Sequence, residues 1–173
     1  PSGVIEGTAH EPDGRSPLYA ELLYFVTKMY RRVRREKIDP WKFVGISPRL
    51  HITHSDGREL DLGGRGFSGS VRDLFWEFVD PFLEDIIRQG ADYAVELADK
   101  RGFERAPVLQ EARRLLRSVV VWTYHAMEEV EINQLGRDRQ TILSRKLPPI
   151  ERTDTRGRVA RMQRFVDDII AGW

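Results

Sequence analysis

One segment has the residue types and spacing of a phosphate-binding loop, the G-x-G-x-x-G run Gly64-Arg65-Gly66-Phe67-Ser68-Gly69. Glycine lets the backbone approach a phosphate closely, and free N–H groups at the start of a following helix favour an anion. A dinucleotide site would also need a second parallel strand and an acidic residue about twenty positions later, whereas more helix follows here. The pattern therefore favours a turn in which Ser68 or Ser70 caps the next helix. The functional alternative is an anion site formed by Gly64, Gly66, Ser68 and Ser70.

Histidine and carboxylate side chains occur at metal-ligand spacing in two places. On a predicted helix, His125, Glu128 and Glu129 are three and four positions apart and share a face. Their order is the reverse of the Glu-x-x-His motif of di-metal bundles, and it occurs once. On a predicted strand, His51 and His54 differ by three positions and so face opposite ways. We therefore expect solvated or capped side chains at both places, with no bound metal or cofactor.

Two clusters of arginine are the strongest candidates for a binding surface. One lies at the end of the first predicted helix, where cations are also favourable against the helix dipole. Tyr30 and Trp41 lie close to this cluster in sequence and are candidates for stacking on a nucleic-acid base. The other cluster lies on the last predicted helix, opposite its apolar residues. The two clusters comprise Arg31, Arg32, Arg34, Arg35, Arg156, Arg158, Arg161 and Arg164.

Charge is unevenly distributed along a chain whose net charge is only +1. Residues 68–100 carry eight acidic and three basic side chains, whereas residues 101–164 carry eight acidic and fourteen basic ones. Arginine supplies 23 of the 28 basic residues, and its planar fork suits carboxylates and phosphates. The uneven distribution has two interpretations: acidic and basic helices pair within the fold, or the basic helices bind an external partner.

The composition excludes several kinds of chemistry. The chain contains no cysteine, which excludes disulfides, thiol catalysis and thiolate metal sites. No apolar run approaches the roughly eighteen residues of a membrane span, and the start has no signal-peptide pattern. We therefore expect a cytoplasmic protein that does not insert into a membrane.

Hydrophobic residues at helical spacing predict four long helical regions, at residues 16–37, 71–100, 107–134 and 154–173. In the second region the apolar stripe keeps its phase across Pro81. Proline kinks or restarts a helix, so we expect two segments there that share one core face.

A β-hairpin is expected at residues 50–62. A three-residue loop at residues 55–57, with Gly57 left-handed, would pair Ile52 with Leu60. That register places the apolar residues of both strands on one face, whereas a two-residue loop would divide them between two faces. The sequence therefore predicts the three-residue loop.

These elements predict a mainly α protein built as a bundle of four to five helices, with a small hairpin inserted between the first two long helices. A single domain would occupy residues 16–173 and follow a flexible arm at residues 1–15. Residues 136–154 are polar, contain two consecutive prolines, and are expected to form a connection.

No candidate set of catalytic residues has a convincing spacing or context, so we expect a non-enzymatic interaction or regulatory module. It would bind an acidic protein partner through the arginine-rich helical surface. The first alternative is nucleic-acid binding through the same surfaces. The second is a phosphorylated small ligand, or an enzyme acting on one, at residues 63–70. Trp173 ends the last apolar stripe and suggests a homodimer interface.

Overall fold

The computed structural model describes residues 14–144 and 151–173 and confirms the predicted mainly α bundle with its hairpin. The predicted arm at residues 1–15 lies almost wholly outside the described residues. The α-helices are α1 (Tyr19–Val33), α2 (Gly69–Phe78), α3 (Asp80–Arg101), α4 (Arg105–Ser144) and α5 (Arg156–Ala171). The hairpin consists of β1 (His51–Thr53) and β2 (Glu59–Asp61).

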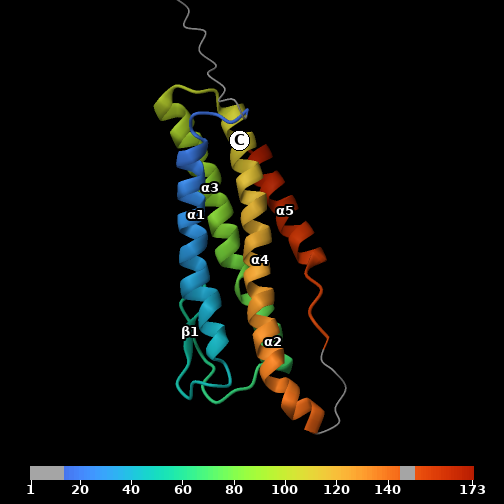
Figure 1. The fold of residues 1–173 in the computed structure, drawn as a ribbon. Helices are drawn as coiled ribbons and strands as arrows, with labels where there is room; N and C mark the ends of the chain where they lie inside the picture. The colour runs from blue at the N-terminus through green and yellow to red at the C-terminus, as the bar shows by residue number, and fades with distance from the viewer. Residues whose placement is uncertain (1–13, 145–150) are drawn as a thin grey trace, which may run out of the picture.

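Helices α3 and α4 form the centre of the bundle, and α1 and α5 flank them on opposite sides (Figure 1). Helices α1 and α4 run in one direction, whereas α3 and α5 run in the other. Both flanking helices contact both central helices, so each buries its apolar stripe in the groove between α3 and α4. Leu22 and Val26 do so for α1, and Met162 and Val166 for α5.

The helix α1 starts and ends by different means. Before the helix, the Oγ of Ser16 accepts a hydrogen bond from the Leu18 N–H at 3.2 Å. Ser16 also donates through its N–H and its Oγ to the carboxylate of Glu111, which ties this end to α4. At the other end the helix widens into a π turn (Arg34–Ile38) and then tightens into a 3₁₀ turn (Asp39–Phe43) that contains Pro40.

The end of the bundle next to the hairpin has an aromatic core. The ring of Trp41 lies 5.1 Å from that of Phe75 and 5.3 Å from that of Phe78, between centroids. Trp41 is fully buried, so the prediction that it offers a stacking surface to a nucleic acid is wrong. Its position within the 3₁₀ turn that follows the π turn directs it into the core instead.

The hairpin has the predicted register. Ile52 pairs with Leu60, and Gly57 adopts the left-handed conformation, with φ of 85°. Ile52 is buried and Leu60 half-buried, whereas both neighbours of Ile52 on β1 are exposed. Burial of one apolar face therefore selects the three-residue loop, as argued from the sequence.

The proline break also has the predicted form. Helix α2 ends at Phe78, and α3 begins at Asp80 after one intervening residue, with Pro81 in its first turn. Phe75 and Leu83, on either side of the break, are both buried. The two segments therefore share one core face.

The connection after α4 is shorter than predicted. The sequence placed the end of this helix at Gln134 and a polar connection at residues 136–154, but the helix continues to Ser144. Glycine at position 136 costs about 1 kcal/mol relative to alanine and does not by itself end a helix. The first proline after it comes only at position 148. The polar composition of residues 136–154 therefore led to a wrong prediction of where α4 ends.

Replacing Gly90 by valine is expected to destabilise the bundle. A Cβ at Gly90 would lie 2.7 Å from Cδ2 of Leu116, where α3 packs against α4. Overpacking a core of this kind costs about 1–3 kcal/mol in the free energy of unfolding, which chemical denaturation would measure. Gly157→Ala is the control, because a Cβ there meets no atom within 4 Å among the described residues. It should leave stability unchanged or raise it by up to about 1 kcal/mol. If the Gly90→Val variant were as stable as the wild type, the close packing of α3 against α4 at this position would be contradicted.

Candidate functional site

Among the described residues, the most buried charged group is Glu131 of α4, whose side chain is 2% exposed. Arg72 of α2 approaches it with a forked pair of hydrogen bonds, at 3.1 Å from Nε and 3.0 Å from Nη2. The indole N–H of Trp76 and the N–H and Oγ1 of Thr153 also donate to this carboxylate. Glu131 therefore joins α2, α4 and the segment that leads into α5.

These contacts keep Glu131 ionised. Burial raises the pKa of a carboxylate, but the hydrogen bonds from Arg72, Thr153 and Trp76 outweigh burial and lower the pKa of Glu131. Sequence reasoning missed this residue. Its one local signal is a charged residue beside the buried Val130 and one turn after the buried Met127, within the core stripe of α4. All of its partners lie within the protein, so the cluster is a structural anchor.

The predicted histidine and glutamate cluster on α4 lies at the surface. His125 is 70% exposed, and its ring nitrogens lie 3.8 Å from Glu128 and 3.6 Å from Glu129. Glu129 pairs with Arg34 of α1 at 3.0 Å, and Glu128 accepts a hydrogen bond from Thr155. In the part of the chain that the structure describes, no three histidine or acidic side chains are placed to hold a metal ion. Both acids serve contacts between helices.

The side chains of His51 and His54 face opposite ways, as predicted. His51 is exposed on β1, whereas His54 packs edge-on against the ring of Phe78 and lies 3.3 Å from Asp56. The burial of His54 against an aromatic ring accounts for its position without a ligand.

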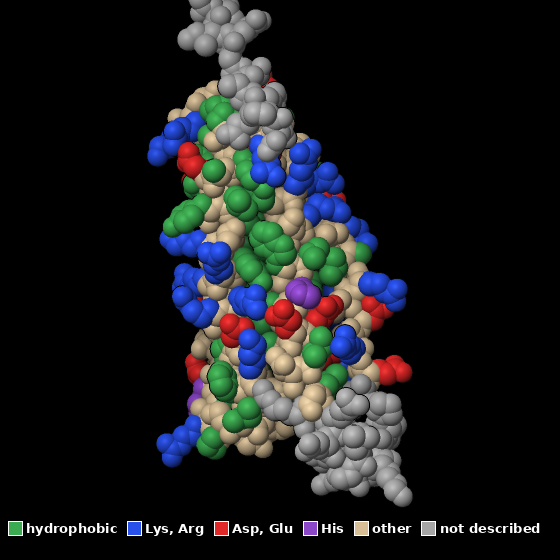
Figure 2. Space-filling view, in the orientation of Figure 1, with side chains coloured by type: hydrophobic (Ala, Val, Ile, Leu, Met, Phe, Trp, Pro, Cys, Tyr) green, Lys and Arg blue, Asp and Glu red, His purple; other side chains and the backbone are tan. Residues whose placement is uncertain are grey.

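The arginines at the end of α1 have two kinds of environment. Arg34 turns toward α4, where it meets Glu129 and donates to the hydroxyl of Tyr30 at 3.5 Å. Arg32 and Arg35 are exposed and share Glu36, each at 3.2 Å. Arg31 is exposed and has no ion-pair partner among the described residues. Figure 2 shows Lys and Arg side chains along the left of the view, the side on which α1 lies in Figure 1.

Three of the four arginines predicted as a surface on α5 make contacts within the protein. Arg158 donates to the carbonyl oxygen of Trp76 at 2.9 Å and lies over its ring. Arg161 pairs with Asp80 at the start of α3, and the same carboxylate accepts the hydroxyl of Tyr124 at 2.7 Å. Burial and the neighbouring Asp80 raise the pKa of Tyr124, which keeps the phenol protonated.

Arg156 makes a local contact at the start of α5. It pairs with Asp154 at 2.9 Å, and its hydrogen bonds lower the pKa of that carboxyl to about 2. Both side chains are exposed, so the pair adds little to stability.

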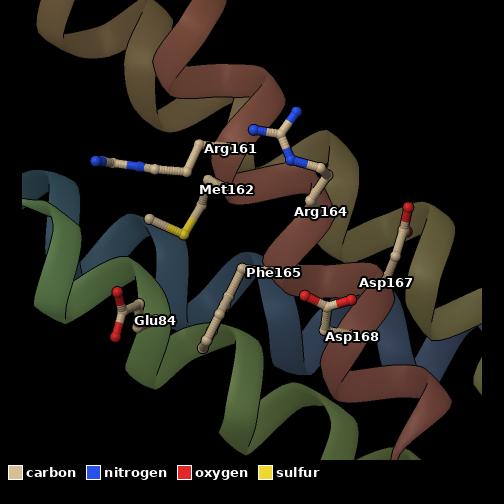
Figure 3. Close-up of a pocket in the computed structure, with 7 residues that line it drawn as sticks. All are labelled: Glu84, Arg161, Met162, Arg164, Phe165, Asp167 and Asp168. Atoms are coloured by element: carbon tan, nitrogen blue, oxygen red, sulfur yellow. The ribbon is translucent and has the colours of Figure 1, made fainter.

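A shallow groove of about 540 Å³ runs beside α5 (Figure 3). Asp167 in this groove pairs with Arg113 and Arg117 of α4, each at 2.7 Å, whereas Arg164 has no ion-pair partner among the described residues. With two arginines and three acids, the groove has no excess of positive charge to select an anion. It is lined by Glu84 of α3 and by Arg161, Met162, Arg164, Phe165, Asp167 and Asp168 of α5.

The two arginine clusters lie on opposite sides of the bundle, because α1 and α5 flank it on different sides. The structure therefore does not bring them together into one basic surface. Each cluster has three exposed arginines, but the contacts differ. On α1 only Arg34 contacts another helix, whereas on α5 both Arg158 and Arg161 do.

The glycine-rich loop is anchored in the core. Phe67 is 2% exposed, and its ring centroid lies 5.2 Å from that of Phe75. Gly63 approaches the backbone of Pro48 so closely that a Cβ would lie 2.2 Å from the carbonyl oxygen. The need for glycine at position 63 therefore comes from packing within the protein.

The residues predicted to bind an anion are exposed around the start of α2. Gly64 and Gly69 adopt left-handed conformations, with φ of 69° and 49°. Ser68 occupies the N-cap position with an extended backbone, but its side chain does not make the expected capping hydrogen bond. Gly66 and Ser70 are also exposed. The loop geometry is compatible with a simple connection from β2 to α2.

In comparisons with protein-family models, curated proteins and solved structures, no match to this chain was found. Among the described residues, no helix is long and apolar enough to cross a bilayer. The function of this protein is therefore inferred from the surfaces of the structure itself.

Replacing Gly63 by alanine is expected to destabilise the protein by about 1–3 kcal/mol, because the new Cβ would collide with backbone that cannot move alone. Gly66→Ala is the control from the same loop, since a Cβ there meets no atom within 4 Å in the described structure. Thermal and chemical denaturation would measure both variants. If the two lost equal stability, the packing argument for Gly63 would be wrong.

Replacing Glu131 by glutamine should destabilise the protein by roughly 3 kcal/mol at neutral pH, because Arg72 would lose its buried counter-ion. The pKa of Glu131 is lowered from its ordinary 4.5, so the carboxylate contributes stability above that pH. The contribution is lost as the pH falls through the lowered pKa. The difference in unfolding free energy between wild type and variant should therefore narrow below about pH 4.5.

Glu77→Gln, at an exposed position on α2, is the control for that experiment and should change stability by less than about 0.5 kcal/mol. A stability difference for Glu131→Gln that stayed constant from neutral to acidic pH would show that the ionised carboxylate does not carry the effect.

Proposed function

We propose that the chain is a non-enzymatic, cytoplasmic interaction module that binds an acidic protein partner through the outer face of α1. The observation that supports this is an exposed basic strip in which only Arg35 has an ion-pair partner, Glu36, among the described residues. Tyr24, Lys28, Arg31 and Arg35 follow at helical spacing, opposite the buried stripe of α1. Lys28 and Arg31 have no ion-pair partner among the described residues. We refer to these four residues as the α1 strip.

The α1 strip combines long-range attraction with a contact surface. Tyr24 is 71% exposed, and tyrosine buries a large area at low entropic cost when it is covered by a partner. The nearby basic side chains would attract an acidic surface and restrict its orientation. The arginines of α5 support this role less well, because Arg158 and Arg161 already satisfy groups of the bundle.

The alternative of nucleic-acid binding uses the same basic side chains but loses part of its support. Trp41, one of the two aromatic residues near the cluster, is buried, and Tyr30 is half-buried against Trp122. Binding to phosphates would also make affinity fall steeply with salt, with a slope set by the number of phosphates contacted.

A labelled poly-glutamate peptide would test the α1 strip by fluorescence anisotropy, with a single-stranded oligonucleotide as the competing probe. Lys28→Glu combined with Arg31→Glu should weaken binding of the peptide roughly tenfold, because two attractive contacts become repulsive. The control is Lys100→Glu combined with Arg164→Glu, which changes the net charge equally at exposed positions elsewhere.

An equal loss of affinity in both double variants would show that net charge, rather than the α1 strip, governs binding. Tighter binding of the oligonucleotide than of the peptide, with a steep salt dependence, would replace this proposal with the nucleic-acid alternative.

A further inference from the structure

The outer face of α4 carries an exposed apolar centre. Val121 is 46% exposed, and its neighbour Trp122 is only partly buried, with its ring 5.6 Å from that of Tyr30 on α1. Figure 2 shows hydrophobic side chains gathered over α1 and α4 in the middle of this face. The exposed valine and the partly buried tryptophan give the middle of this helix face an apolar surface.

Charges of opposite sign lie at equal distances from this centre. Arg114 precedes Val121 by seven residues, and Glu128 follows it by seven. Seven residues are close to two helical turns, so all three side chains lie on one face, with about 10 Å between successive positions. Figure 2 shows acidic side chains just below the apolar centre. The face thus changes from basic to apolar to acidic along α4.

Such a pattern is complementary to itself when reversed. A twofold axis through Val121, perpendicular to α4, would place a second α4 antiparallel to the first. Val121 would then face its own copy, and Arg114 of each chain would face Glu128 of the other. The two ion pairs form together or not at all, because a twofold interface repeats every contact.

We infer that a second copy of this chain covers the outer face of α4, in an antiparallel dimer centred on Val121 with reciprocal contacts between Arg114 and Glu128. This interface is separate from the α1 strip, which lies opposite the core of its own helix. The dimer therefore does not depend on the proposed binding of an acidic partner.

The side chains at the two ends of this face are available for such contacts. Arg114 is exposed and has no ion-pair partner among the described residues. Glu128 is 39% exposed, and its Oε1 accepts the Thr155 hydroxyl, while its Oε2 lies on the side of His125, 3.8 Å from that ring. Oε2 therefore has room to accept from an arginine of the second copy.

A second copy fits this face better than an unrelated acidic or basic partner. A uniformly acidic partner would be repelled by Glu128 and Glu129 at one end, and a uniformly basic one by Arg114 at the other. Only a partner with the reverse order of charges matches both ends, and an antiparallel copy of α4 has that order.

Sedimentation velocity of the full chain, from low to high micromolar concentration, tests the inference. Val121→Asp is expected to shift the protein to monomer, because it places two carboxylates at the axis. Arg114→Glu and Glu128→Arg should each raise the dimer dissociation constant roughly tenfold or more, since each reverses both symmetric pairs. The double variant Arg114→Glu/Glu128→Arg restores opposite charges at both sites and should return the dissociation constant to near the wild-type value.

Thr155→Val is the matched control for Glu128→Arg. It removes the same hydrogen bond within the chain and leaves the charge of Glu128 in place, so the dimer should persist. Circular dichroism and thermal melting of each variant would separate loss of association from loss of folding. Lys28→Glu/Arg31→Glu should also remain dimeric, which distinguishes failure of this inference from failure of the α1 strip.

Three outcomes would overturn the inference. The wild-type chain could remain monomeric at high micromolar concentration, which would leave the face to a different protein. A dimer unaffected by Val121→Asp would lie on another surface, such as the one around Trp173, which is 53% exposed. A double variant no better than the single ones would disprove the pairing of Arg114 with Glu128.

Discussion

The rest of the bundle depends on satisfying the buried carboxylate of Glu131. A charge removed from water is costly unless other charges and donors replace the water. Here the replacements come from Arg72 and Trp76 on α2 and from Thr153 before α5, so both segments must converge on one turn of α4. The position of the break between α2 and α3 and the start of α5 are thereby linked, although they are far apart in sequence. One ionised group thus fixes how the helices assemble at the hairpin end of the bundle.

The same requirement for compensation explains why the arginine-rich helices differ. Helix α5 begins beside the proline break, where Arg161 pairs with Asp80 and Arg158 donates to the carbonyl oxygen of Trp76. On the outer face of α1, Lys28 and Arg31 have no ion-pair partner among the described residues, so positive charge remains in excess there. Basic residues that look equivalent in sequence therefore fall into two groups. Some form contacts within the bundle, and others remain exposed without an ion-pair partner. Only the exposed group supports a proposal about binding.

Periodic features of the fold could be predicted from the sequence, whereas its long-range polar contacts could not. The hairpin register was predictable because only one register buries Ile52 and Leu60 together, and the phase of the stripe across Pro81 implied a shared core face. Glu131 has its partners 22 to 59 positions away, and no spacing along α4 reveals what other segments present to it. The end of α4 was misplaced for a related reason, since polarity shows exposure but does not show where a helix stops.

The two proposed surfaces differ in chemistry and would allow this protein to combine weak contacts. Each exposed basic side chain of the α1 strip contributes little alone, and salt screens it further. A twofold dimer formed through α4 would carry two such strips at a fixed separation. An acidic partner that reached both would bind the second strip as an intramolecular step, at a high effective concentration. Self-association and electrostatic binding, each modest in isolation, would then reinforce one another without either face having to change its structure.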